Sequence, residues 1–228
     1  MAVWALIGFM GCGKSSIGRT AAKMLGVGGM PPQEFASLTP PSLRDGPPAS
    51  VPRVARPSEA HHHASAAFID LDEEIVRRCG KSIPEIFSAI GEAGFRAIER
   101  DTLEELLSRK GKAHLPSDIL LSLGGGTLTD EGSRELVKKN CKCIYLRATV
   151  ETLAANLRWE GETASRPMLA GADPKAPAES PDSLESRIAS MMATRGPVYE
   201  KAADIILDID DLDYSDVARQ ILNCFSEK

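Results

Sequence analysis

The sequence predicts an α/β protein in three layers: a five-stranded parallel sheet with helices packed on both of its faces. Two observations lead to this prediction. Short apolar runs that fit buried strands alternate along the chain with longer segments of helical periodicity. The first run, Val3 to Ile7, ends in glycine and leads directly into a helical pattern, which is the first half of a β-α-β unit. We expect one domain over residues 1–228.

The individual elements follow from the spacing of apolar residues and from turn signals. The first helical pattern places Ile17 and Ala21 on one side, and Ser82 with Glu85 forms a capping box at a helix start. The strand patterns are Val3 to Ile7, "AFID", "DILLSL", "CKCIYL" and "DIILDI". The helical patterns are Lys14 to Leu25, "DEEI", about Gly94 to Ser108, Val150 to Trp159, Ser183 to Tyr199 and "YSDVARQILNCF".

Two segments lack any periodicity. Residues 27–67 carry eight of the 15 prolines, and proline fixes φ and removes a backbone donor, so we expect a disordered surface insertion there. Residues 159–183 are rich in glycine, proline and alanine and lie between two helical patterns. We expect this second segment to form a mobile lid.

Composition narrows the classes of partner. The net charge is −5 and no long basic stripe occurs, which argues against nucleic acid and anionic membranes as partners. No apolar run approaches the ~20 residues needed to span a bilayer. The five cysteines are scattered, which favours reduced thiols and a cytoplasmic protein, although a plastid stroma after processing of a precursor would fit equally. We expect a monomer, with membership of a larger polypeptide as an alternative.

The stretch "GFMGCGKSS" predicts a phosphate-binding loop. Gly8, Gly13, Lys14 and Ser15 match the pattern G-x-x-x-x-G-K-[ST] between a strand and a helix. Backbone N–H groups and the helix N-terminus attract phosphate, the lysine reaches the outer phosphates, and the serine hydroxyl is a ligand for Mg²⁺. The loop indicates ATP or GTP with Mg²⁺, and it leaves the phosphoryl acceptor open.

Candidate residues for the acceptor side occur in three places. Asp70 and Asp72 follow the second strand, where one carboxylate can lie near Mg²⁺ and the other can accept a proton; alternatively, one of them only caps the next helix. Arg96 and Glu99 share a helix face, as a substrate clamp or as a surface ion pair. Three glycines after "DILLSL" allow a close backbone approach, or form only a tight turn.

Two further arginines lie next to proline. Arg166, in "SRPML", belongs to the predicted lid, where it can close over a γ-phosphate; Arg195, in "TRGPVY", ends a helix before the last strand. Each is alternatively a solvated surface arginine. An acceptor that carries a carboxylate would need such residues, because arginine binds carboxylates with two parallel hydrogen bonds.

Taken in order, these motifs resemble those of shikimate kinase: the phosphate loop, D-x-D, "GE..FR..E", "SLGGG", an R-P lid and "R.P.Y". The resemblance covers nearly the whole chain except the proline-rich segment. It implies the nucleoside-monophosphate-kinase-like P-loop fold, with a substrate-binding subdomain over residues 68–110. It also implies transfer of the ATP γ-phosphate to the 3-hydroxyl of shikimate, a step of chorismate and aromatic amino acid biosynthesis.

The resemblance implies specific roles on the ATP side. Lys14 would hold the transferring group, and Ser15 would ligate Mg²⁺ directly, with Asp70 helping through water. Arg166 would meet the phosphates and Arg158 would lie over the adenine. The residues implied to bind ATP are Gly11, Cys12, Gly13, Lys14, Ser15, Ser16, Arg158 and Arg166.

On the substrate side, the resemblance implies that Asp72 binds the shikimate hydroxyls and acts as base or orienting group. Arg96 and Arg195 would clamp the carboxylate, with Glu99 orienting Arg96. The backbone of Gly125 and Gly126 would lie against the ring. Together, Lys14, Asp72 and Arg166 form the implied catalytic set.

Two alternatives stay open at this point. A related small-molecule kinase, such as a gluconate kinase, would also need a carboxylate site, and a kinase-like protein that has lost activity would serve as a binding module. The lid segment looks longer than is usual for the family, which puts its kinetics in doubt. The contacts of the acidic stretch from Asp208 to Asp213 are unassigned.

Overall fold

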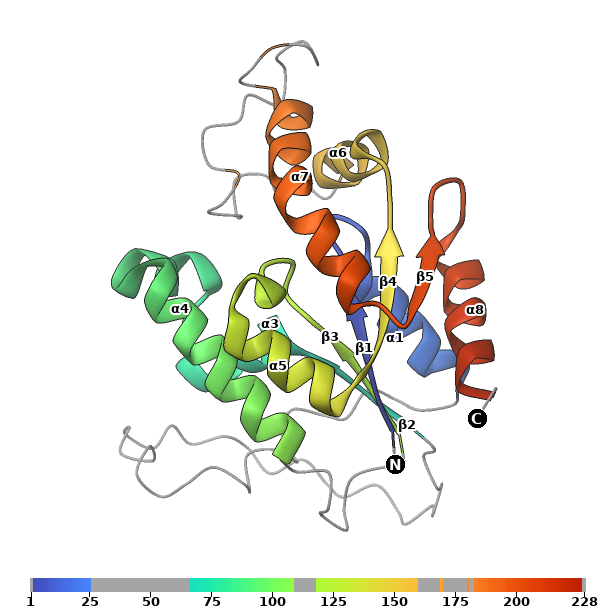
Figure 1. Ribbon diagram of the computed structural model, residues 1–228, viewed down its shortest axis with the longest axis horizontal. Helices are drawn as coiled ribbons and strands as arrows, with labels where there is room; N and C mark the ends of the chain where they lie inside the picture. The colour runs from blue at the N-terminus through green and yellow to red at the C-terminus, as the bar shows by residue number, and fades with distance from the viewer. Residues whose placement is uncertain are drawn as a thin grey trace, which may run out of the picture.

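Five parallel strands form one sheet, in the order β2-β3-β1-β4-β5 (Figure 1). The computed structural model describes residues 2–25, 66–108, 118–159, 169, 180 and 183–226. The strands are β1 (Ala2–Ile7), β2 (Ala66–Asp70), β3 (Asp118–Ser122), β4 (Lys142–Arg147) and β5 (Ile205–Asp208). The predicted α/β fold class, with its five strands, is confirmed.

The helices fill the connections between these strands. They are α1 (Lys14–Met24), α3 (Leu71–Cys79), α4 (Ile83–Ser108), the 3-10 turn η4 (Thr127–Thr129), α5 (Glu131–Asn140), α6 (Val150–Trp159), α7 (Leu184–Ala202) and α8 (Tyr214–Ser226). Helices α1 and α8 pack together on one face of the sheet, while α5 and α7 cover the other (Figure 1). Both faces are therefore buried, as a parallel sheet requires.

The central strand β1 explains why the first apolar run has no polar alternation. It pairs with β3 on one side and with β4 on the other, and Val3 to Ile7 are at most 3% exposed. In the register, Leu6 lies opposite Ser122 of β3 and Ile144 of β4. All five carboxyl ends therefore meet at one edge of the sheet, where ligands bind in open α/β folds.

The boundaries differ from the sequence-based prediction in three places. Strand β2 begins at Ala66 because it pairs with Asp118 of β3, so the last two residues of the segment 27–67 belong to the sheet; the others lie outside the described residues. Helix α4 begins at Ile83, and Gly91, with φ 70°, breaks it into two parts. Helix α5, which Asp130 caps through the Ser133 N–H, was not predicted.

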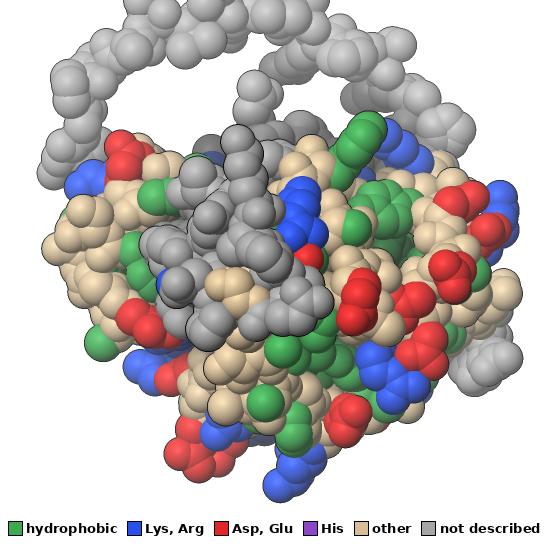
Figure 2. Space-filling model, turned by 90° about the horizontal axis from the view of Figure 1, so that it is seen from above, with side chains coloured by type: hydrophobic (Ala, Val, Ile, Leu, Met, Phe, Trp, Pro, Cys, Tyr) green, Lys and Arg blue, Asp and Glu red, His purple; other side chains and the backbone are tan. Residues whose placement is uncertain are grey.

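Charged side chains are mixed on the face at the carboxyl ends of the strands. Seen from that side, the Lys and Arg side chains of the described residues lie singly among Asp and Glu side chains (Figure 2). Within the described ranges, no helix is long and apolar enough to cross a membrane.

A partly buried cluster of ion pairs links α3 to α4. Glu74, 6% exposed, accepts hydrogen bonds from Arg77 and Arg78, and Arg78 also pairs with Glu105 of α4 at 2.5 Å. Burial acts to raise the pKa of Glu74, but the hydrogen bonds and charges of the two arginines outweigh it, and the pKa lies below its ordinary value.

We expect Glu74→Gln to lower the free energy of unfolding by about 1–3 kcal/mol at pH 7. Because the folded pKa is depressed, the carboxylate stabilises the fold above its unfolded pKa, near 4.5, and this stabilisation is lost as the pH falls through the folded value. Urea unfolding from pH 7 to pH 3 measures this, with Glu104→Gln, an exposed glutamate of α4, as control. A difference from wild type that stays constant down to pH 3 would contradict the expectation.

Candidate active site

The loop between β1 and α1 has the backbone geometry of a phosphate cradle. Gly11 and Gly13 have φ values of 82° and 78°, in the left-handed region that favours glycine. A Cβ on Gly13 would also lie 2.9 Å from the ring of Tyr214, at the start of α8. No acidic residue occupies the first turn of α1, so the helix N-terminus attracts anions.

Lys14 is the cation of this cradle. Its side chain is buried, and Nζ donates to the carbonyl oxygens of Gly8 and Phe9, each at 2.9 Å. The thiol of Cys12 is fully buried, with Sγ 3.7 Å from Nζ. The side chain of Cys12 is thus enclosed by the protein and does not line the cavity described below.

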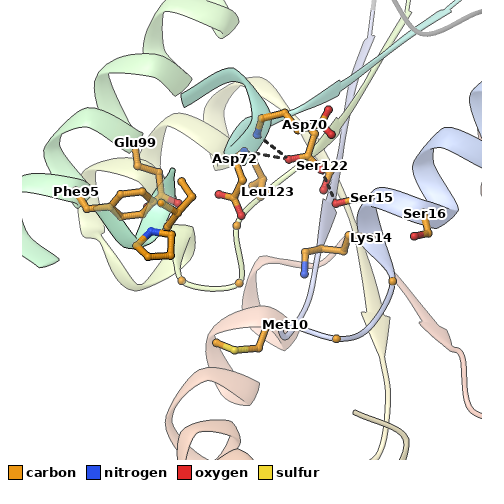
Figure 3. Close-up of a pocket in the computed structure, with 18 of the residues that line it drawn as sticks. Met10, Lys14, Ser15, Ser16, Asp70, Asp72, Phe95, Glu99, Ser122 and Leu123 are labelled. Atoms are coloured by element: carbon orange, nitrogen blue, oxygen red, sulfur yellow. Dashed lines mark hydrogen bonds between the residues drawn. The ribbon is translucent and has the colours of Figure 1, made fainter. Parts of the chain in front are cut away.

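Asp70 connects the second strand to the cradle. Its side chain caps α3 by accepting from the N–H groups of Asp72 at 3.0 Å and Glu73 at 3.3 Å, and it also accepts from the Ser15 hydroxyl (Figure 3). Of the two aspartates in "IDLD", the helix cap is therefore Asp70. Asp72 lies in the first turn of α3, and its carboxylate projects toward the same part of the cavity as Lys14 (Figure 3).

The three glycines after β3 each have a close neighbour. A Cβ on Gly124 would lie 2.8 Å from Oε1 of Glu99 and 3.0 Å from Oδ1 of Asp72. A Cβ on Gly125 would lie 3.0 Å from the backbone nitrogen of Met10, in the phosphate loop. The third, Gly126, faces a guanidinium, described next. The run of glycines lets the loop touch two carboxylates, the phosphate loop and an arginine at once.

Arg96 and Glu99 form a buried pair on α4. Nη1 of Arg96 donates to Oε2 of Glu99 at 2.6 Å, and Oε1 of Glu99 accepts from Thr127 Oγ1 at 2.6 Å. Glu99 is fully buried, and a Cβ on Gly126 would lie 2.2 Å from Nη2 of Arg96. This burial contradicts the alternative of a surface ion pair.

Arg195 reaches the glycine loop from α7. It is 7% exposed, and Nη1 lies 3.4 Å from the carbonyl oxygen of Gly125. The hydroxyl of Tyr199 donates to the same oxygen. Burial raises the pKa of Tyr199 well above its ordinary value, so the hydroxyl stays protonated and remains a donor.

One cavity of about 450 Å³ brings most of the predicted residues together. The predicted residues that line it are Gly11, Gly13, Lys14, Ser15, Ser16, Asp70, Asp72, Arg96, Glu99, Gly125 and Gly126. Cys12, Arg158 and Arg195 do not line it, and Arg166 lies outside the described residues together with most of the predicted lid.

Apolar side chains also line this cavity, and the motif analysis assigned no role to them. Ile83, Phe87 and Phe95 of α4 and Met10 of the phosphate loop all line it. Phe95 and Met10 are labelled in Figure 3. The rings of Phe87 and Phe95 are 4.5 Å apart, centroid to centroid. The "SIPEIF" segment contains Ile83 and Phe87. The capping box predicts a helix start there, and the spacing of these two apolar residues would place them on one face of that helix.

The acidic stretch before α8 is held by β4 and by Thr149, which precedes α6. Arg147 binds Asp208 at 2.6 Å and 2.8 Å, and Asp210 accepts from the backbone and hydroxyl of Thr149, each at 3.0 Å. Elsewhere, Arg158 of α6 pairs with Glu185 of α7 at 2.6 Å. The contacts of Asp208 and Asp210 therefore hold the loop between β5 and α8 in place, a role that the sequence had not assigned.

Chemically, the cavity combines a phosphate cradle with groups that suit a second, small acidic substrate. The cradle end carries Lys14 and the Ser15–Asp70 oxygen pair. The rest of the lining includes the Asp72 carboxylate, the Arg96 guanidinium and apolar side chains, a combination that suits a small ring with hydroxyls and one acid group. Such a cavity fits phosphoryl transfer from a nucleotide to a hydroxyl compound.

Comparisons with known proteins point to the same chemistry. The shikimate kinase of Bordetella avium is 30% identical over 217 residues, covering 95% of this chain and 76% of that protein. The Chlorobium chlorochromatii shikimate kinase is 40% identical over 143 residues, covering 63% of this chain and 68% of that protein. A solved structure of the Acinetobacter baumannii shikimate kinase in complex with shikimate has 26% identity and a TM-score of 0.68, covering 100% of this chain and 94% of that one.

The family model described as "Shikimate kinase" matches residues 60–226. The match begins near the end of the proline-rich segment and includes Asp72, Arg96, the glycine loop and Arg195, while the relatives' alignments extend over most of the chain. With the phosphate loop, the acceptor side and the five-stranded sheet all in place, the chain belongs to the shikimate kinase family.

Proposed function

We infer that this chain transfers the γ-phosphoryl group of ATP to the 3-hydroxyl of shikimate and releases shikimate 3-phosphate and ADP. The observation that carries this inference is the shared cavity. Lys14 and Ser15 line the same cavity as Asp72 and Arg96, so a nucleotide and an acidic hydroxyl compound would meet inside it. The family's activity supports the same reaction.

At the nucleotide end, the backbone of the loop and Lys14 would hold the phosphates. The ammonium of Lys14 is buried against two carbonyl oxygens, which keeps it close to the N-terminus of α1. A γ-phosphate placed there would be held by the lysine charge and by the helix N-terminus together. These groups would stabilise the charge that spreads over the phosphoryl oxygens during transfer.

The residues beside the cradle fit Mg²⁺. Ser15 and Asp70 are in contact through their oxygens, one a hydroxyl and one a carboxylate, which are the ligand types that this ion prefers. We propose that Ser15 would ligate the ion directly and that Asp70 would act through water. When bound, the ion would neutralise charge on the β- and γ-phosphates.

Asp72 is the residue we propose to orient the attacking hydroxyl and accept its proton. As the shikimate oxygen forms a bond to the γ-phosphorus, the bond from that phosphorus to the oxygen of the β-phosphate breaks, and ADP leaves. The proton of the hydroxyl passes to the Asp72 carboxylate. Its position beside Gly124, projecting into the cavity from α3, is consistent with this role.

We propose that Arg96 binds the shikimate carboxylate. Glu99 takes Nη1 of Arg96, while the buried Nε has no hydrogen-bond partner among the described residues. Within the described ranges, the one partner of Nη2 is an exposed glutamate, Glu92, at 3.4 Å. Nε and Nη2 form one edge of the guanidinium, and that edge suits a carboxylate with two parallel hydrogen bonds.

Arg195 would complete the carboxylate site from α7, and Gly125 and Gly126 would lie against the ring. Arg195 already reaches the glycine loop, through Gly125. We further propose that Arg158 lies over the adenine and that Arg166, in the lid, closes on the phosphates. Both of these roles rest on the family resemblance.

The test is ADP release by the purified chain with Mg²⁺ and ATP, measured separately with shikimate, gluconate, nucleoside monophosphates and no acceptor. We expect ADP release that depends on shikimate, with phosphorus NMR showing a phosphate monoester on the product. Turnover with gluconate and none with shikimate would identify a different small-molecule kinase. Absence of turnover with every acceptor, despite ATP binding, would identify an inactive binding module.

A further inference from the structure

We propose that Thr127 is a positioning residue whose hydroxyl holds the Glu99 carboxylate so that Arg96 keeps its bidentate edge open for the substrate carboxylate. The inference rests on the proposed function, in which Arg96 binds that carboxylate. It adds a third member to the chain of contacts behind the arginine. Thr127 touches neither substrate in this scheme and acts only through Glu99.

The contact between Thr127 and Glu99 is enclosed. Both residues are fully buried, and Oγ1 of Thr127 lies 2.6 Å from Oε1 of Glu99. Among the described residues, Glu99 receives one hydrogen bond at each oxygen, from Thr127 and from Arg96. Because water is excluded from a fully buried carboxylate, each of these donors is needed to satisfy it.

Each oxygen of the Glu99 carboxylate has a different donor, and this division determines which edge of the Arg96 guanidinium stays available. With Oε1 occupied by the hydroxyl, Oε2 takes only Nη1 of Arg96, and the Nε–Nη2 edge is left for another acceptor. Without the hydroxyl, Oε1 would be a buried acceptor with no donor, which is costly. The carboxylate would then turn to take a second N–H from the guanidinium, in competition with substrate.

The backbone around Thr127 keeps this hydroxyl in place. Its N–H donates to the carbonyl oxygen of Gly124 at 3.1 Å, which starts the turn η4. The preceding Gly126 lets Arg96 approach the turn, since a Cβ there would lie 2.2 Å from Nη2. The turn thus brings the hydroxyl, the glutamate and the arginine together from two elements.

The chain offers a matched control within the same turn. Thr129 is exposed, and its hydroxyl donates to the carbonyl oxygen of Gly126 at 2.6 Å without reaching Glu99. Thr127→Val and Thr129→Val remove the same group from two neighbouring positions and keep the side-chain shape. Thr127→Ser keeps the hydroxyl and removes only a methyl group.

We expect Thr127→Val to raise KM for shikimate roughly tenfold, the effect of losing a hydrogen bond to a charged group. In this variant, KM for ATP should stay within about twofold of wild type. In Thr127→Ser and Thr129→Val, KM for shikimate and KM for ATP should both stay within about twofold of wild type. If the valine variant does not fold, Thr127→Ala must give the same rise. The proposal would be overturned if Thr127→Val raised both KM values equally or raised neither. It would also be overturned if Thr127→Ser showed the same rise in KM for shikimate as Thr127→Val.

A double variant separates positioning from general loosening of the site. In an Arg96→Ala background, Thr127→Val should leave KM for shikimate unchanged, because the hydroxyl acts through the arginine. The same tenfold rise in that background would overturn the proposal. Wild type that shows no shikimate-dependent ADP release would overturn the proposed function and this inference together, whereas an active wild type with an unaffected Thr127→Val overturns this inference alone.

Discussion

Asparagine in place of Asp72 is expected to lower kcat with shikimate by about 10²-fold or more, the scale of general-base catalysis. Asparagine is nearly isosteric but cannot accept a proton at neutral pH, so the hydroxyl would lose its proton acceptor and keep its space. KM for ATP should change little, because in the proposed function the phosphates bind at Lys14 and Ser15 and not at Asp72.

The measurement is steady-state ADP release, supported by direct ATP binding by calorimetry. Asp101→Asn is the matched control, since Asp101 is an exposed aspartate on α4 that does not line the cavity. Turnover of Asp72→Asn close to wild type would remove Asp72 from the mechanism. A parallel loss of ATP binding would instead mean that Asp72 supports the phosphate loop.

The second large effect is expected at Arg96. Arg96→Ala should raise KM for shikimate by about 10²-fold, within the range for removing one member of a buried, hydrogen-bonded charge pair. The variant removes the guanidinium proposed to bind the shikimate carboxylate, and it also leaves the buried Glu99 carboxylate without its cation. Part of the loss in affinity therefore arises within the protein itself. KM for ATP should rise far less.

Two further variants sharpen this test. Arg100→Ala changes an arginine one turn further along α4, 43% exposed and paired with Asp130 outside the main cavity, and should leave both KM values near wild type. Arg96→Lys keeps the charge without the planar fork and should recover only part of the affinity. Equal increases in both KM values for Arg96→Ala would refute the carboxylate clamp.

The phosphate loop could be identified from sequence because its chemistry is contiguous. The pattern from Gly8 to Ser15 is set by backbone geometry that eight successive residues determine among themselves, and the strand and helix on either side carry their own apolar periodicities. The fold class followed for the same reason: alternating strand and helix patterns restrict the chain to a parallel sheet.

The roles of single acceptor-side residues were harder to predict. Asp70 and Asp72 are two residues apart, and from the sequence either could cap a helix. The structure decides between them, because the Asp70 side chain accepts hydrogen bonds from the first N–H groups of α3 and from Ser15, which lies 55 positions earlier in the chain. The capping box at Ser82 was partly correct, because Glu85 accepts from the backbone N–H of Ser82. Gly91 then breaks the helix where periodicity alone suggested a new start near Gly94.

By itself, the sequence determined the α/β class, the nucleotide cradle and, through the order of its motifs, the resemblance to shikimate kinases. Only the tertiary structure decided which side chains act together on the acceptor side. The Thr127–Glu99 hydrogen bond joins residues 28 positions apart, and the contact of Tyr199 with Gly125 joins residues 74 positions apart. No local pattern records such pairs, because they form when the carboxyl ends of separate strands converge and burial requires every polar group to find a partner.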